Sequence, residues 1–259
     1  MNGLELNNLK QDIIDQLSQQ LKEDLYAIIV VGGFGLNKIK IEWSDIDLLI
    51  VVNESNLDIK FKIGQQKDKL EQKYSMHFGI SFITKEELLN PKYPEFTYEG
   101  KNLQALLELK LDPSRLIFSR DKIIDKIYFP SSEDIKKYSL SNIAMFRLRN
   151  RRSLTEKTYP KDAEKLKKIL AKEIRAAFII TKLAVQYFAL KTCFDNKDLI
   201  NKATKLFSDF DLRTIKSNLD IIDQWHDFND KEKILKYLES TDQYIEKFSD
   251  YVFKKASQQ

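Results

Sequence analysis

The sequence predicts an α+β protein in which strands occur only in the first half of the chain. Two continuous apolar runs rich in β-branched residues, 25–31 and 45–52, have the length of buried strands. Beyond about Pro130 strand signals disappear and long amphipathic stretches follow, in a chain with only 7 glycines and 5 prolines. We therefore expect a sheet with helices over residues 1–130 and an all-α helical bundle over residues 131–259, divided near Pro130 and the two serines after it.

Periodicity locates the other elements of the first half. Leu9, Ile13, Leu17 and Leu21 recur at helical spacing, which predicts a helix from about residue 6 to residue 25. Short apolar segments at residues 77–84 and 115–119 predict two further strands. Charged or leucine-rich periodic segments predict helices over residues 57–74 and 102–111, the second with Leu103, Leu106, Leu107 and Leu111 on one side.

The second half shows the helical period most clearly between residues 161 and 190. Apolar side chains recur there mostly at spacings of three and four residues. The same period predicts further helices near residues 197–207, 211–225 and 231–255.

Composition excludes several classes of protein. Hydrophobic residues make up 42% and charged residues 32% of the 259 residues, as in soluble globular proteins, and the net charge of +4 alone does not indicate nucleic-acid binding. A single cysteine, Cys193, excludes an internal disulfide and a cysteine zinc cluster, while two distant histidines, His77 and His226, argue against a histidine-rich metal site. The longest apolar run is too short to span a bilayer and the N-terminus lacks a secretory signal, so we expect a cytoplasmic protein without membrane contact.

One segment carries the chemistry. An apolar strand ends at Gly32-Gly33, and about a dozen residues later Ser44-Asp45-Ile46-Asp47 begins the next strand. Alternate residues of a strand point to the same side, so the carboxylates of Asp45 and Asp47 are expected to project together. Such a pair suits Mg²⁺, which takes oxygen ligands from protein and from substrate phosphates.

The glycines complete a pattern for a nucleotide. Gly32 and Gly33 allow backbone N–H groups to approach phosphate oxygens without obstruction by side chains. Either an Asp-x-Asp or a Gly-Gly pair alone is commonly just a turn, but their order and spacing between two apolar strands favour a functional site. The expected ligand is a nucleoside triphosphate with Mg²⁺.

These residues resemble the signature of the nucleotidyltransferase superfamily of the DNA polymerase β type. Gly32, Gly33, Asp45 and Asp47 match it position by position, Ser44 fits its common Ser-Asp-x-Asp form, and the resemblance covers residues 25 to 125. It implies a mixed sheet with helices, one or two Mg²⁺ ions on Asp45 and Asp47, and an NTP, expected to be ATP, seated by Gly33 and its neighbours. With a helical domain behind, the layout resembles bacterial aminoglycoside-type nucleotidyltransferases, which transfer a nucleoside monophosphate to a hydroxyl group.

The sequence departs from this family at the third carboxylate, which usually comes from the next long strand. Residues 77–84 contain no acid, and His77, Gly79 and Ser81 stand on the expected face. Three explanations stay open. The site uses two carboxylates, or another segment supplies the acid (Glu99, Glu108 or Asp121), or the protein binds nucleotide without turnover.

The acceptor is also open. The layout favours a small molecule such as an aminoglycoside-like antibiotic. A tRNA or protein hydroxyl is the second hypothesis, and its support is a basic run that usually forms a solvated helix face: Arg147, Arg149, Arg151, Arg152, Lys157, Lys161, Lys165, Lys167 and Lys168. A silent nucleotide-binding module is the third. His77, His226 and Cys193 are each expected to be structural rather than catalytic.

Overall fold

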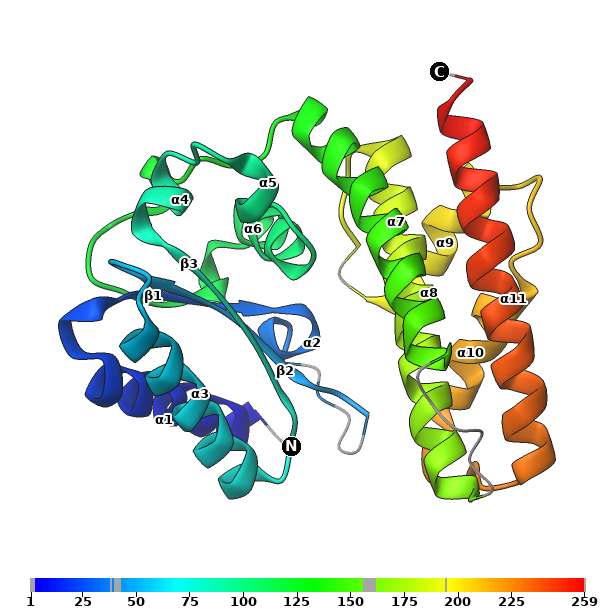
Figure 1. Ribbon diagram of the computed structural model, residues 1–259, viewed down its shortest axis with the longest axis horizontal. Helices are drawn as coiled ribbons and strands as arrows, with labels where there is room; N and C mark the ends of the chain where they lie inside the picture. Colours follow the sequence, from blue (N-terminus) through cyan, green and yellow to red (C-terminus); the bar gives the residue numbers. More distant parts are fainter. Residues whose placement is uncertain (1–2, 38, 40–42, 156–161, 194, 259) are drawn as a thin grey trace. The chain divides into compact units, whose positions relative to one another are not determined.

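A computed structural model describes residues 3–37, 39, 43–155, 162–193 and 195–258 (Figure 1). The chain divides into two compact units, Met1–Ser131 and Ser132–Gln259. The first unit contains a sheet with helices on it and the second is built from helices, which confirms the predicted fold class. No helix in the described ranges combines the length and the apolar character needed to cross a membrane.

The sheet of the first unit has four strands in the order β3-β2-β1-β4. They are β1 (Leu25–Val31), β2 (Ile46–Val52), β3 (Phe78–Thr84) and β4 (Leu116–Ser119). β1 runs antiparallel to both β2 and β4, whereas β2 and β3 are parallel, so the sheet is mixed. All seven residues of β1 are buried, as expected for a central strand that is covered on both faces.

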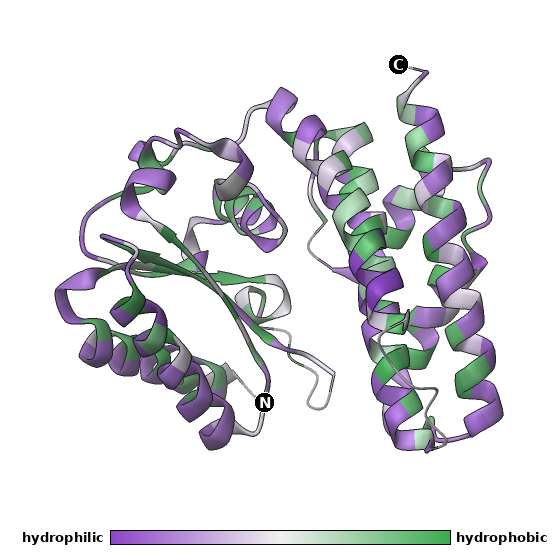
Figure 2. Ribbon diagram, in the orientation of Figure 1, coloured by the Kyte–Doolittle hydropathy of each residue, from purple (hydrophilic) through white to green (hydrophobic). Residues whose placement is uncertain are grey.

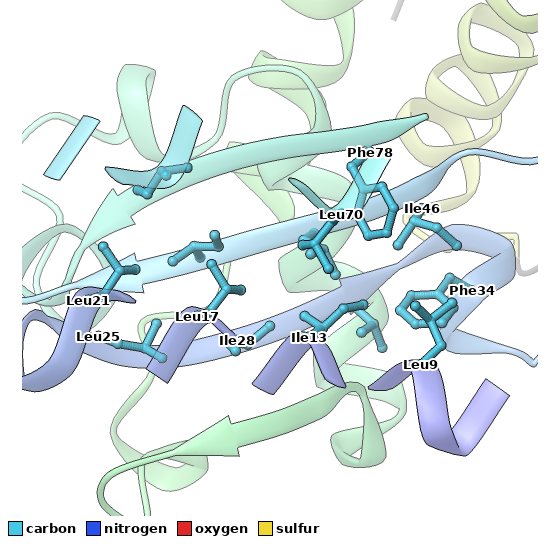
Figure 3. Close-up of a cluster of buried hydrophobic side chains, with 14 of the residues drawn as sticks. Leu9, Ile13, Leu17, Leu21, Leu25, Ile28, Phe34, Ile46, Leu70 and Phe78 are labelled. Atoms are coloured by element: carbon cyan, nitrogen blue, oxygen red, sulfur yellow. The ribbon is translucent and has the colours of Figure 1, made fainter. Parts of the chain in front are cut away.

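One face of this sheet is covered by α1 (Gly3–Leu21) and α3 (Leu57–Tyr74) (Figure 1). The apolar stripe of α1 belongs to one buried cluster with alternate residues of β1 and β2, such as Ile28 and Ile46 (Figure 3). Figure 2 shows the same arrangement as apolar strands enclosed by helices whose outer sides are hydrophilic. The apolar residues that recur every three or four positions in α1 therefore form the surface that packs on the sheet.

The opposite face is covered by α4 (Lys85–Leu89), α5 (Pro94–Thr97) and α6 (Lys101–Leu111) (Figure 1). α6 packs against β1 and buries Leu103, Leu106 and Leu107, whereas Leu111, which the sequence grouped with them on one side of the helix, is exposed. Because Ile46 and Leu48 belong to the core on the other face, Asp47 between them is directed toward the side of α6.

The second unit is organised around α8 (Ala163–Ala189), which packs against α7 (Ser132–Thr155), α9 (Asn196–Leu206), α10 (Arg213–Asp223) and α11 (Lys231–Ala256). Inside it, Thr181 and Tyr244 share a buried hydrogen bond of 2.8 Å. Four of the helices were predicted. α7 was not, because its apolar residues do not form a clear stripe. The predicted start of the longest helix, Lys161, lies outside the described residues.

Candidate active site

The register of the sheet brings the two halves of the sequence motif together. β1 and β2 are antiparallel with Val31 opposite Asp47. The glycine segment that leaves β1 after Val31 therefore begins beside the point where the two aspartates enter β2. Asp45 directly precedes β2, rather than opening it as the sequence suggested, and Asp47 is its second residue. Ser44 and Asp45 are both partly buried.

The glycine segment, which the sequence predicted as a turn, is a short helical turn, α2 (Gly32–Gly35). Gly32 has a φ of +65°, in the left-handed region that a residue with a Cβ adopts only at a cost. The carbonyl of Gly33 accepts a hydrogen bond of 3.1 Å from the N–H of Leu36, which closes the turn. Glycine is thus the residue that adopts this backbone conformation at position 32 without strain.

A buried ion pair supports this turn from the side of α6. The carboxylate of Glu108 accepts a hydrogen bond of 2.8 Å from the Gly32 N–H and lies 2.8 Å from Nη1 of Arg115. Both charged side chains are fully buried. The same Arg115 nitrogen donates to the carbonyl oxygens of Val30 and Gly32, at 3.4 and 3.3 Å. A buried charge is tolerated only when it is paired and hydrogen-bonded, so these two residues fix the backbone at the start of the motif.

Asp47 forms an ion pair with Lys101, the first residue of α6. The contact joins Nζ of Lys101 to Oδ1 of Asp47, and the side chains are 40% and 25% exposed, so a ligand can reach both. Within the described part of the chain, Oδ2 of Asp47 has no bonding partner. The sequence did not indicate this lysine, because nothing in the motif spacing points fifty residues downstream.

The three proposed sources of a third carboxylate differ in position. Glu108 is buried and already bonded to Gly32 and Arg115. Asp121 accepts a hydrogen bond of 3.3 Å from the hydroxyl of Tyr26, near the far end of β1. The five residue steps from Tyr26 to Val31 span about 17 Å, which excludes Asp121 from the motif. Glu99 is exposed and lies two residues before Lys101.

The donors at Asp45 and Asp47 fit a hard divalent cation. Mg²⁺ typically binds through one or two carboxylates and completes its shell with water and substrate phosphates. Among the described residues no group of three or more His, Cys, Asp or Glu side chains converges on one point. In the part of the chain that the structure describes, such an ion would find carboxylate oxygens but no cage built from side chains alone.

The histidine beside the motif is engaged elsewhere. His77 precedes β3, and its Nδ1 lies 2.8 Å from a carboxylate oxygen of Glu71 on α3. Its backbone carbonyl accepts a hydrogen bond of 2.9 Å from the N–H of Ile46. His77 thus helps to join β3 to the start of β2, in agreement with the structural role expected from the sequence.

Part of the arginine run is neutralised by α11. Arg147 and Arg151 both bond Glu246, with Nε to carboxylate distances of 2.7 Å, and Nη1 of Arg147 lies 2.5 Å from Asp250. The two arginines, led by Arg151, hold the pKa of Glu246 at about 2. Lys157 and Lys161 of the same run lie outside the described residues. Arg147 and Arg151 thus join α7 to α11.

Comparison with protein-family models finds one family that matches the part of the chain containing the motif. Residues 11–103 match the family model described as the nucleotidyltransferase domain, which extends from α1 into α6 and includes the glycine turn, both aspartates and Lys101. This part of the first unit is thus similar in sequence to a nucleotidyltransferase domain.

Among solved structures, the chain is similar to spectinomycin adenyltransferase AAD(9) from Enterococcus faecialis, crystallised with ATP and spectinomycin. The TM-score is 0.54 at 13% sequence identity, and the match covers 95% of this chain and 100% of that one. At this identity the likeness establishes a shared fold, and it extends over both units. No curated protein sequence matches the chain.

Proposed function

We propose that the protein transfers a nucleoside monophosphate from ATP, with Mg²⁺, to a hydroxyl group of a small molecule. The observation that carries the proposal is the pairing of Val31 with Asp47, because it sets the glycine turn beside Asp47, two residues after Asp45, at one end of the sheet. A triphosphate can contact backbone N–H groups of such a turn while its metal ion contacts the carboxylates.

The reaction is an in-line displacement at the α-phosphorus. The acceptor oxygen forms a bond to this phosphorus, the bond to the pyrophosphate oxygen breaks, and the hydroxyl proton is released. Mg²⁺ on Asp45 and Asp47 would neutralise charge that develops on the phosphate oxygens. In this proposal Ser44 and Gly33 help to hold the nucleotide, and the Glu108–Arg115 pair keeps the turn in place.

A small-molecule acceptor is supported by the solved relative, whose crystals hold spectinomycin. An aminocyclitol or an aminoglycoside-like antibiotic is therefore the first class of acceptor to test. The hypothesis of an RNA acceptor relied on the arginine run, and the engagement of Arg147 and Arg151 with acids of α11 weakens that support.

A silent nucleotide-binding module is the second candidate function. The specific observation in its favour is that Gly79, and not an acid, stands beside Asp47 in the parallel pairing of β2 and β3. Such a protein binds ATP but releases no pyrophosphate with any acceptor.

The test is pyrophosphate release from each NTP with Mg²⁺, in the presence of separate pools of aminocyclitols, aminoglycosides and tRNA. We expect release with ATP and one small-molecule pool, and its loss in Asp47→Asn and on addition of EDTA. The matched control is Asp58→Asn, since this exposed aspartate on α3 pairs with Lys62 on the same helix. Release that persists in Asp47→Asn contradicts the site, and ATP binding without release in any pool supports the silent module.

A further inference from the structure

The polar side of α6 lies along the whole motif. Lys101, Gln104 and Glu108 follow one another at spacings of three and four residues, which places them on one face of the helix. Lys101 bonds Asp47, whereas Glu108 bonds the Gly32 N–H and accepts a hydrogen bond of 2.7 Å from Gln104. One helical face therefore contacts both the glycine turn and a carboxylate of the candidate metal site.

Gly79 leaves the space in which the ammonium of Lys101 is held. It pairs with Asp47 in the parallel ladder of β2 and β3. A Cβ at position 79 would stand 2.1 Å from Oδ1 of Asp47 and 2.8 Å from Nζ of Lys101. Any larger residue would displace the ion pair. The position from which a third carboxylate would face Asp47 is thus filled by the positive end of Lys101.

We propose that Lys101 is a built-in cation of the nucleotide site, which bridges Asp47 and the triphosphate so that the chain binds ATP with a single divalent ion. An ammonium group has three donors, and only one is needed for Asp47. The others are available to phosphate oxygens, which lysine commonly binds as a point charge. The inference rests on the proposed function, since it states which positive charges compensate the triphosphate in the same site.

The geometry favours one ion over two. Sites for two metal ions hold them about 3.5–4 Å apart, which requires bridging acidic ligands. Here Oδ1 of Asp47 is occupied by Lys101 and only Oδ2 remains for a divalent ion. A second ion would have to replace the ammonium, and no described third acid converges there to hold it.

The test counts metal ions and measures nucleotide affinity without any turnover. Mn²⁺ uptake is followed by electron paramagnetic resonance, and binding of α,β-methylene ATP by calorimetry, for wild type, Lys101→Met and Gly79→Ala. Lys110→Met is the matched control, because it removes the same charge from the last turn of α6, where Lys110 is exposed and faces the ring of Phe129.

We expect one Mn²⁺ per wild-type chain with the analogue. Lys101→Met should bind the analogue about ten-fold more weakly, as for loss of a hydrogen bond to a charged group, and should bind Mn²⁺ alone more tightly because its competitor is gone. Gly79→Ala should also bind the analogue more weakly and Mn²⁺ more tightly, although Lys101 is intact. Lys110→Met should show neither change. Thermal unfolding of each variant verifies that it is folded.

Two Mn²⁺ ions per wild-type chain, or unchanged analogue affinity in Lys101→Met, overturns the inference and leaves the proposed function in place. Failure of wild type to bind the analogue overturns the proposed function, and this inference with it.

Discussion

The buried carboxylate of Glu108 on α6 accepts a hydrogen bond of 2.8 Å from the backbone N–H of Gly32, the first residue of the glycine turn. This contact ties the sequence motif to a helix that the motif itself does not include. The same carboxylate pairs with Arg115, which bonds the carbonyl of Gly32. The turn is thus held at both its N–H and its C=O by a buried pair of opposite charges.

Loss of this carboxylate charge should destabilise the first unit strongly. Glu108→Gln leaves the fully buried Arg115 without its compensating charge, and breaking such a pair costs about 3–5 kcal/mol. We expect that decrease in the free energy of unfolding, measured in urea. The comparison is Asp58→Asn, which removes the carboxylate charge of the exposed Asp58–Lys62 pair. This change should lower the free energy of unfolding by less than about 1 kcal/mol. Equal effects of the two variants would contradict the structural role of Glu108.

Two glycine-to-alanine variants should have opposite effects. A Cβ at Gly35 would meet Nη1 of Arg115 at 2.1 Å, so the buried guanidinium must move, and we expect a loss of about 1–3 kcal/mol. A Cβ at Gly64 meets nothing within 4 Å, and this residue lies within α3. Gly64→Ala should therefore stabilise by about 0.5–1 kcal/mol, because alanine loses less backbone entropy in a helix. Urea denaturation measures both, and stabilisation by Gly35→Ala would contradict the packing of Arg115.

The pairing of α7 with α11 should make stability depend on pH. Glu246 has a pKa of about 2 in the folded protein, lowered from 4.5 chiefly by Arg151 and then by Arg147. As the pH falls from 4.5 toward 2, the unfolded chain takes up a proton that the folded chain does not, so stability decreases. After allowance for partial exposure, we expect a contribution of about 1–2 kcal/mol. Glu246→Gln should have a lower free energy of unfolding at pH 7, and this free energy should change less between pH 4.5 and pH 2 than in wild type. A pH dependence of stability parallel to that of wild type would contradict the pairing.

Cys193 should react slowly while the protein is folded. Burial raises the pKa of its thiol to about 11, and the side chain is 2% exposed. The thiolate is the reactive form, so little of it exists at pH 8. Ellman's reagent should therefore modify the thiol slowly in buffer and rapidly in denaturant. Rapid modification in buffer would mean that this part of the second unit opens readily.

The sequence alone determined the fold class, the four strands and the motif at Gly32, Gly33, Asp45 and Asp47, because each depends on local periodicity or on spacing along the chain. It also identified α6 by its leucines. It did not reveal α7, whose apolar residues form no clear stripe, or the helical form of the glycine turn.

Only the tertiary structure decided what surrounds the motif. Lys101, Glu108 and Arg115 lie far from the motif along the chain, and strand pairing and the packing of α6 bring them to it. The same pairing places Gly79 beside Asp47 and Asp121 at the far end of β1. Contacts of this kind depend on how elements pack in space, and the one-dimensional pattern of apolar and polar residues does not record which polar residues will meet.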